Sequence, residues 1–117
     1  MKVSVVIPVF NSSKTIVEVV RRTVDTMKSE KLAYEIVIVD DASTDESWKK
    51  VSDLSVTNKN IIAIKLLKNV GQHSANLCGF RHCGNDVIIT LDDDLQNPPE
   101  EIPKLLSLFS QGKDVVY

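Results

Sequence analysis

The sequence predicts an α/β fold, with a mostly parallel open sheet and helices on both faces, and two observations support this. Short segments rich in Val and Ile alternate along the chain with segments whose apolar residues recur at helical spacing. One helix-like segment separates each strand-like segment from the next, an alternation typical of parallel sheets with right-handed crossovers. The 117 residues and 43% hydrophobic content are enough for the core of one domain.

The first predicted unit is a strand followed by a helix. The strand covers residues 2–10 (KVSVVIPVF), which are apolar and largely β-branched. Residues 11–30 carry apolar side chains at helical spacing, and Ser12 or Ser13 is the predicted cap of that helix.

The second unit repeats the pattern. Residues 34–39 (YEIVIV) predict a strand, and a helix carrying Trp48 follows it. Ser43 and Glu46 have the spacing of a capping box, which predicts the start of this helix.

The third and fourth strands are predicted over residues 60–67 and 86–91, with a helical segment within 69–85 between them. Gly79 lies inside that helical segment, where we expect it to permit a close backbone approach.

A last helix is predicted within residues 97–112, because Pro and Glu open it and Gly112 ends it. Residues 114–117 (DVVY) predict the start of another strand. We therefore expect the domain to continue beyond the given sequence, and an open sheet edge there would favour pairing between chains, which leaves a homo-oligomer as an open alternative.

Composition excludes some classes of partner. The formal net charge of −2 has mixed signs, so a nucleic-acid partner is not expected. No apolar run approaches the ~20 residues that span a bilayer, which predicts a soluble, cytoplasmic segment. Cys78 and Cys83 are expected to be free thiols, and His73 and His82 to be surface residues rather than metal ligands.

Polar and aromatic residues follow three of the predicted strands. Phe10 and Asn11 follow the first, Asp40 and Asp41 the second, and residues 92–94, all aspartates, the fourth. In an open parallel sheet, ligands bind beyond the carboxyl ends of the strands, so these residues should share one rim. Five carboxylates on one rim need an offset, and a divalent cation that arrives with a phosphate-bearing ligand supplies one.

Alternation along an extended segment predicts that Asp92, Asp94 and Gln96 face this cleft while Asp93 faces elsewhere. Two carboxylates and one amide oxygen form a partial set of ligands for Mg²⁺ or Mn²⁺.

Asp40 and Asp41 suit another task, because carboxylates accept hydrogen bonds from a nucleobase imide or from ribose hydroxyls. Structural alternatives remain open: these two residues could begin a turn and cap a helix, and residues 92–94 could be a solvated loop. Pro8 fits a strand exit, and Gly71 fits either a plain turn or an anion-binding helix start.

Four segments, in this order, resemble the motifs of the family 2 glycosyltransferases with the GT-A fold. They are VSVVIPVFN, EIVIVDDASTDES, NVGQHSANLCGF and IITLDDDLQNPPE. The segment LDDDLQNPPEEIPKL most resembles the branch that transfers a sugar from a nucleotide donor to a polyprenyl (dolichyl or undecaprenyl) phosphate. The resemblance extends along the whole chain and implies that residues 1–117 are the N-terminal nucleotide-sugar-binding part of the catalytic domain.

The resemblance also implies functional residues. The nucleotide-sugar donor would be bound by Pro8, Phe10, Asn11, Asp40, Asp41, Asp92 and Asp93. The metal, Mg²⁺ or Mn²⁺, would be held by Asp92, Asp94 and Gln96. One departure is Ser12, which stands where many members have an acidic residue. The general base that many inverting members use is expected beyond residue 117.

The implied reaction is metal-dependent, inverting transfer from a UDP- or GDP-sugar to a polyprenyl phosphate, or to a saccharide in cell-surface polysaccharide synthesis. A phosphate monoester, with a second pKa near ~6, is already a nucleophile at pH 7, whereas an alcohol needs a base. We therefore favour the lipid phosphate, at the cytoplasmic face of a membrane, with membrane association through the part that follows residue 117.

Two other classes of function remain open. Receiver domains of response regulators share the length, the parallel architecture and an Mg²⁺-binding acidic pair, but their pair follows the first strand, whereas Asp40 and Asp41 follow the second. A non-catalytic nucleotide-binding domain is the other alternative, because a fold does not fix a function.

Overall fold

The computed structural model describes residues 2–85, 87–96 and 98–110; for residues 109 and 110 it describes the backbone alone. Its strands are β1 (Lys2–Val9), β2 (Ala33–Asp40), β3 (Ile61–Lys65) and β4 (Val87–Thr90). Its helices are α1 (Ile16–Ser29), α2 (Ser47–Thr57), α3 (Gln72–Arg81), the 3₁₀ turn η1 (Pro99–Glu101) and α4 (Ile102–Ser110).

The strands of the described residues form one sheet in the order β3-β2-β1-β4, and every neighbouring pair is parallel. Parallel neighbours need a crossover connection, and α1, α2 and α3 provide the three crossovers. The strand order changes direction at β1, because β2 and β3 are added on one side of it and β4 on the other. The predicted parallel α/β fold is confirmed.

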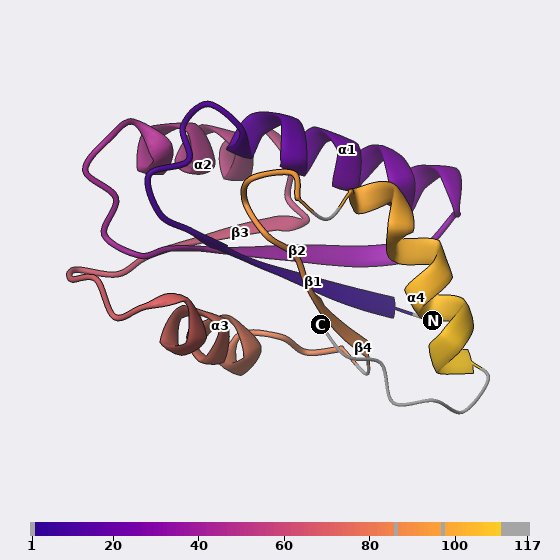
Figure 1. The fold of residues 1–117 in the computed structure, drawn as a ribbon. Coiled ribbons are helices and arrows are strands. Elements are labelled where there is room, and N and C mark those ends of the chain that lie inside the picture. Colours follow the sequence, from indigo (N-terminus) through magenta and orange to yellow (C-terminus); the bar gives the residue numbers. More distant parts are fainter. Residues whose placement is uncertain (1, 86, 97, 111–117) are drawn as a thin grey trace.

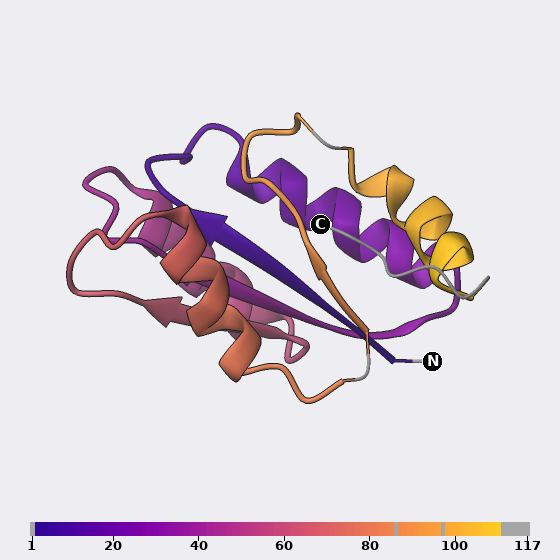
Figure 2. The ribbon, with the colours of Figure 1, turned by 60° about the horizontal axis from the view of Figure 1, so that its bottom comes forward.

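Helices cover both faces of this sheet, as predicted. Figure 1 shows α1 and α2 above the sheet and α3 below it. After rotation, Figure 2 shows α3 in front of the strands, with α1 and α4 on the opposite side. The chain therefore forms three layers, with the sheet in the middle.

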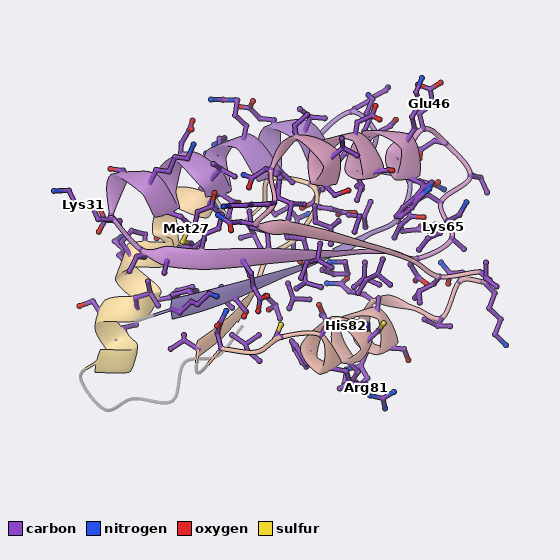
Figure 3. All side chains as sticks on the ribbon, turned by 180° about the vertical axis from the view of Figure 1, so that it is seen from behind. Met27, Lys31, Glu46, Lys65, Arg81 and His82 are labelled. Carbon is purple, nitrogen blue, oxygen red and sulfur yellow. The ribbon has the colours of Figure 1, made fainter. Side chains whose placement is uncertain are left out.

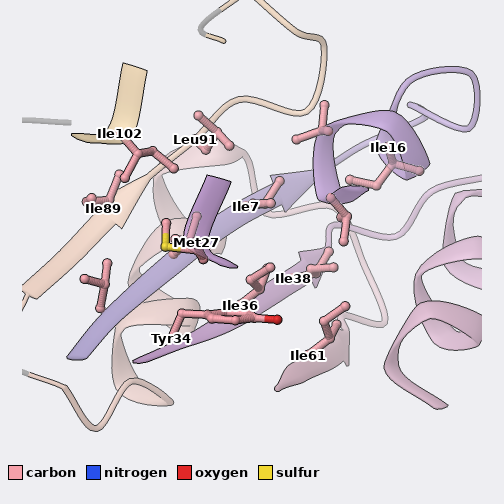
Figure 4. Packing of buried hydrophobic residues seen from close by; sticks show 14 of the residues in the cluster. Ile7, Ile16, Met27, Tyr34, Ile36, Ile38, Ile61, Ile89, Leu91 and Ile102 are labelled. Carbon is pink, nitrogen blue, oxygen red and sulfur yellow. The ribbon is translucent and has the colours of Figure 1, made fainter. Parts of the chain in front are cut away.

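Alternate residues of β1 fill two separate cores. Val3, Val5 and Ile7 belong to the larger core, which also includes Met27 of α1 and Ile102 of α4 (Figure 4). Figure 3 shows Met27 between α1 and the sheet. This core fixes α1, α2 and α4 on one face.

The smaller core lies under α3. It contains Val6, Val37, Val39 and Ala75 as its fully buried members. Gly79 of α3 lies so close to β1 that an added Cβ would come within 2.4 Å of Val6 Cγ1. The predicted close approach at Gly79 is confirmed.

The predicted cap of the first helix is wrong. The helix begins at Ile16, one turn later than a cap at Ser12 requires, and its N-cap, Thr15, makes no side-chain capping bond. The backbone carbonyl of Ser12 accepts from Thr15 N at 3.1 Å and Ile16 N at 2.9 Å instead. The Ser12 side chain is engaged elsewhere, by Asp93.

The predicted capping box is also wrong. Glu46 is the N-cap of α2 but makes no side-chain cap bond. The Asp45 carboxylate accepts from Ser47 N at 2.8 Å instead, and Ser43 Oγ accepts from Asn11 N at 2.9 Å. Ser43, which the local pattern assigned to the helix cap, therefore makes a tertiary hydrogen bond with Asn11 instead.

Other expectations have mixed outcomes. Cys78 and Cys83 are free thiols, and burial raises the pKa of Cys83. His73 and His82 are exposed, as expected. The strand predicted over 114–117 and the helix stop at Gly112 lie outside the described residues. Within the part of the chain that the structure describes, no helix is long and apolar enough to cross a membrane.

Candidate functional site

A pocket of about 410 Å³ lies at the carboxyl ends of the central strands. Its lining comes from the ends of β1 and β2, the start of α3 and the loop after β4: Pro8, Val9, Phe10, Asp41, Asn69, Gly71, Gln72 and Asp93. In Figure 3, the labels Glu46 and Lys65 mark this end of the molecule, and Lys31 marks the other end. The strand order changes direction here, at β1, which is where open α/β sheets bind ligands.

The exit of β1 forms an apolar wall of the pocket. Pro8 lies on the same face of β1 as Val6, the face that α3 covers. Phe10 follows the strand and is 47% exposed. Both residues were predicted, and both line the pocket.

Asn11 holds a loop rather than lining the pocket. Its φ of 50° places it in the left-handed region, which Asn tolerates well. Its Oδ1 accepts from Thr44 N at 2.8 Å, and its own N donates to Ser43 Oγ at 2.9 Å. These bonds tie the β1–α1 loop to the β2–α2 loop.

Asp40 is fully buried and does not reach the pocket. One carboxylate oxygen, Oδ2, accepts from Ser43 N at 3.2 Å, while Oδ1 has no partner among the described residues. Asp40 is therefore not among the residues that line the pocket, and the hydrogen bond that it accepts from Ser43 shapes the β2–α2 loop.

Asp41 lines the pocket but is only 3% exposed. Its Oδ1 accepts from Val70 N at 2.8 Å, and its Oδ2 accepts from Gly71 N at 2.9 Å. Its carbonyl oxygen accepts from Asn69 Nδ2 at 3.3 Å. The residue therefore holds the whole segment that leads into α3.

Asp93 points into the site, which corrects the expectation that it faces elsewhere. Its Oδ2 accepts from Phe10 N at 3.0 Å and from the Ser12 hydroxyl, and Thr15 Oγ1 donates to its carbonyl at 2.5 Å. The alternation argument fails because this segment is not extended: Asp93 lies in a turn, and Leu95 has a φ of 66°.

Asp92, Asp94 and Gln96 lie on the same loop but outside the pocket lining. Asp92 is half-buried and accepts from Gln72 Nε2 at 3.3 Å. Asp94 is exposed, and its Oδ1 accepts from Gln96 N at 3.2 Å. Gln96 lines a neighbouring hollow of about 380 Å³, together with Pro98 and others.

The oxygen chemistry of these three residues fits a hard divalent cation. Mg²⁺ and Mn²⁺ prefer carboxylate and carbonyl oxygens, and they commonly take one or two carboxylates while substrate phosphates complete the shell. Among the residues in the described ranges, no three His, Cys, Asp or Glu gather into a metal site. Asp92, Asp94 and Gln96 supply two carboxylates and one amide oxygen, which are donors of the type that such a cation takes.

Asn69 and Gln72 line the pocket, and sequence reasoning missed them as site residues. The rule that selected the residues after the other strands applies equally to those after β3. Residues 66–71 separate β3 from α3, however, so the relevant side chains are several positions beyond the strand end. Hydrogen bonds to Asp41 hold this segment at the rim of the pocket, and no pattern in the sequence indicates those bonds.

Comparison with known proteins identifies the family of these motifs. A family model described as glycosyl transferase family 2 matches residues 4–117. Among solved structures, S. aureus TarS 1-349 in complex with UDP-GlcNAc is 26% identical, with a TM-score of 0.71, over 96% of this chain and 32% of that one.

A mannosyltransferase, PcManGT from Pyrobaculum calidifontis, in complex with GDP-Man and Mn²⁺, is 24% identical with a TM-score of 0.68, over 79% of this chain and 27% of that one. M. tuberculosis glucosyl-3-phosphoglycerate synthase is 21% identical with a TM-score of 0.71, over 96% of this chain and 41% of that one. The chain thus spans less than half the length of these proteins, and their likeness confirms the GT-A fold.

Proposed function

The chain belongs to glycosyl transferase family 2, and from this premise we propose that residues 1–117 form the nucleotide-sugar-binding part of a glycosyltransferase catalytic domain. The observation that carries the proposal is the pocket at the point where the strand order changes direction. Its lining combines an exposed aromatic ring, Phe10, with two carboxylates, Asp41 and Asp93. Such a mixture of apolar and polar groups suits a nucleoside.

We assign the donor contacts by position. Pro8, Phe10, Asp41 and Asp93 line the nucleoside part of the pocket. Asn11 and Asp40 act on the donor indirectly, since their hydrogen bonds hold the loops around the pocket and neither side chain lines it. Asp92 lies on the loop after β4, outside the pocket lining, and we assign it to the diphosphate of the donor.

The same loop would hold the metal. Asp92, Asp94 and Gln96 are the proposed protein ligands of Mg²⁺ or Mn²⁺, and the similar PcManGT structure contains Mn²⁺ with GDP-Man. A bound cation would stabilise the negative charge on the departing nucleoside diphosphate. UDP and GDP are the candidate nucleotides, because the similar structures hold a UDP-sugar and a GDP-sugar.

For the acceptor we propose a polyprenyl phosphate, at the cytoplasmic face of a membrane. Its phosphate oxygen is ionised at pH 7 and can attack the sugar carbon without a general base. Attack opposite the departing diphosphate inverts that carbon. A saccharide acceptor is the second candidate, and it requires a carboxylate base from outside residues 1–117.

The receiver-domain alternative is contradicted. Receiver domains have the flavodoxin-like strand order 2-1-3-4-5, in which β1 lies between β2 and β3. Here β1 lies between β2 and β4, and β3 pairs with β2. The family match along residues 4–117 excludes it independently.

A double variant tests the proposed metal and diphosphate residues. Asp92→Asn with Asp94→Asn removes two ionised oxygen ligands, so Mn²⁺-dependent binding of UDP or GDP should weaken by at least about tenfold. A double variant with the same charge change on α1 and α2, Asp25→Asn with Asp53→Asn, is the matched control and should bind as the wild type does. Calorimetry measures the affinities. An Asp92/Asp94 variant that binds as tightly as the wild type would contradict the assignment of these two residues to the metal and the diphosphate.

A further inference from the structure

We propose that Gln72 is a positioning residue for Asp92, and that it couples the nucleoside side of the pocket to the acidic loop. The inference rests on the proposed function and deepens it. Gln72 lines the pocket, while its side-chain amide donates to the Oδ1 of Asp92, which does not line it. The residue therefore stands between the two parts of the proposed donor site.

The backbone around Gln72 is held in place by contacts with Asp41 and with the sheet. Gln72 is the first residue of α3, and Gly71 before it is fixed by the 3%-exposed carboxylate of Asp41. Gly71 has a φ of 90°, a conformation that side-chain-bearing residues rarely adopt. One turn further along, Ala75 is fully buried against the sheet. The start of α3 is thus anchored at both ends of its first turn.

The chemistry of an amide suits this task. Gln72 offers an N–H donor without a positive charge, so it can orient the Asp92 carboxylate without neutralising it. A lysine or arginine at this position would compete with a cation for the same carboxylate. Hydrogen bonds that orient a ligating carboxylate raise metal affinity, and their loss typically costs about 10–100-fold.

The contact is 3.3 Å long, slightly longer than the usual range for N–H···O bonds. Bonds of this kind are often long in unliganded sites and shorten when the substrate is bound. Gln72 is exposed, so its role is not to stabilise the core. Substitution should therefore leave folding unchanged and alter only what Asp92 does.

The test compares Gln72→Met, which keeps the length of the side chain and removes the donor, with His73→Met. His73 is the next residue of α3, is exposed and does not line the pocket, so this variant is the matched control. The diphosphate that the wild type binds, UDP or GDP, is titrated by calorimetry over a range of Mn²⁺ concentrations. Thermal unfolding checks that all three proteins are equally folded.

We expect Gln72→Met to weaken binding by about tenfold and to raise the Mn²⁺ concentration needed for half-maximal binding by a similar factor, with His73→Met unchanged. Wild-type affinity in Gln72→Met would overturn the inference. Weaker binding at an unchanged Mn²⁺ midpoint would also overturn it, because Gln72 would then act on the nucleotide rather than through Asp92. Failure of the wild type itself to bind either diphosphate would overturn the proposed function, and this inference with it.

Discussion

The carboxylates near the pocket differ in their hydrogen-bond donors, and these donors indicate the role of each residue. Asp41 accepts two backbone N–H groups of the segment before α3, and Asp93 accepts from the segment after β1. Each of these two residues therefore joins loops around the pocket. Asp94 is exposed and makes a local bond to Gln96 N, so a ligand can reach it without breaking a tertiary contact.

At the same scale, we expect Asp45 to make the free energy of unfolding decrease as the pH falls into the acidic range. Asp45 is exposed, and the desolvation that opposes its ionisation is outweighed by hydrogen bonds from Ser47 and Ser13, which lower the pKa of Asp45 from 3.8 to about 2. Because the folded-state pKa lies below the unfolded one, the stabilisation is complete above about pH 4 and is lost as the pH falls toward about 2.

We therefore expect Asp45→Asn to lose less stability than the wild type between about pH 4 and about pH 2, since it has no proton to gain there. Urea unfolding monitored by circular dichroism at several pH values measures the difference. Parallel pH profiles for the two proteins would show that Asp45 contributes nothing to acid sensitivity.

Sequence reasoning could identify many of the residues at the rim, but not the contacts among them. The rule for strand ends selected Phe10, Asp41 and Asp93, which all line the pocket, and the family resemblance added Pro8. The alternation argument, however, wrongly turned Asp93 away from the site. The rule for strand ends could not show that Asp40, the last residue of β2, is fully buried, because adjacent residues at a strand end point to opposite sides and only the packed loops decide which side is open.

At the scale of elements, the close packing of α3 on β1 depends on one glycine. A Cβ at position 79 would lie 2.4 Å from Val6 Cγ1, so Gly79→Ala should destabilise the fold by about 1–3 kcal/mol through overpacking. Gly84→Ala is the control, since no atom lies within 4 Å of its added Cβ.

Chemical denaturation of both variants checks this expectation. Adding Val6→Ala to Gly79→Ala should cost less than the two single substitutions together, because the smaller side chain makes room for the new methyl group. Equal stability of Gly79→Ala and the wild type would mean that α3 does not pack on β1 as closely as described.

The elements themselves were predictable, while their beginnings were not. Apolar patterning indicated most of the described helices and strands, because burying one face of an element requires such a pattern, and the last helix was predicted from the Pro and Glu residues at its start. Both predicted caps failed, since Ser12 and Ser43 make tertiary hydrogen bonds with Asp93 and Asn11 instead. Short-range patterns do not contain those partners, which are 81 and 32 residues away in the chain.

At the scale of the whole molecule, one topological feature creates the site. The chain adds β2 and β3 on one side of β1, then crosses the opposite face through α3 to add β4 on the other side. The loops after β1, β2 and β4 and the start of α3 therefore converge at one end of the sheet (Figures 1 and 2). Sequence alternation predicted a parallel sheet, but this order of strands follows only from the packed structure.

The most direct measurement is a calorimetric titration of the folded chain with UDP, GDP, CDP and ADP, first with Mn²⁺ and then with excess EDTA. Circular dichroism establishes beforehand that the chain is folded. The account predicts that UDP or GDP binds with Mn²⁺ and that EDTA abolishes the binding, because Asp92 and Asp94 need the cation to accept a diphosphate. A folded chain that binds no nucleoside diphosphate, or binds one equally well in EDTA, would contradict it.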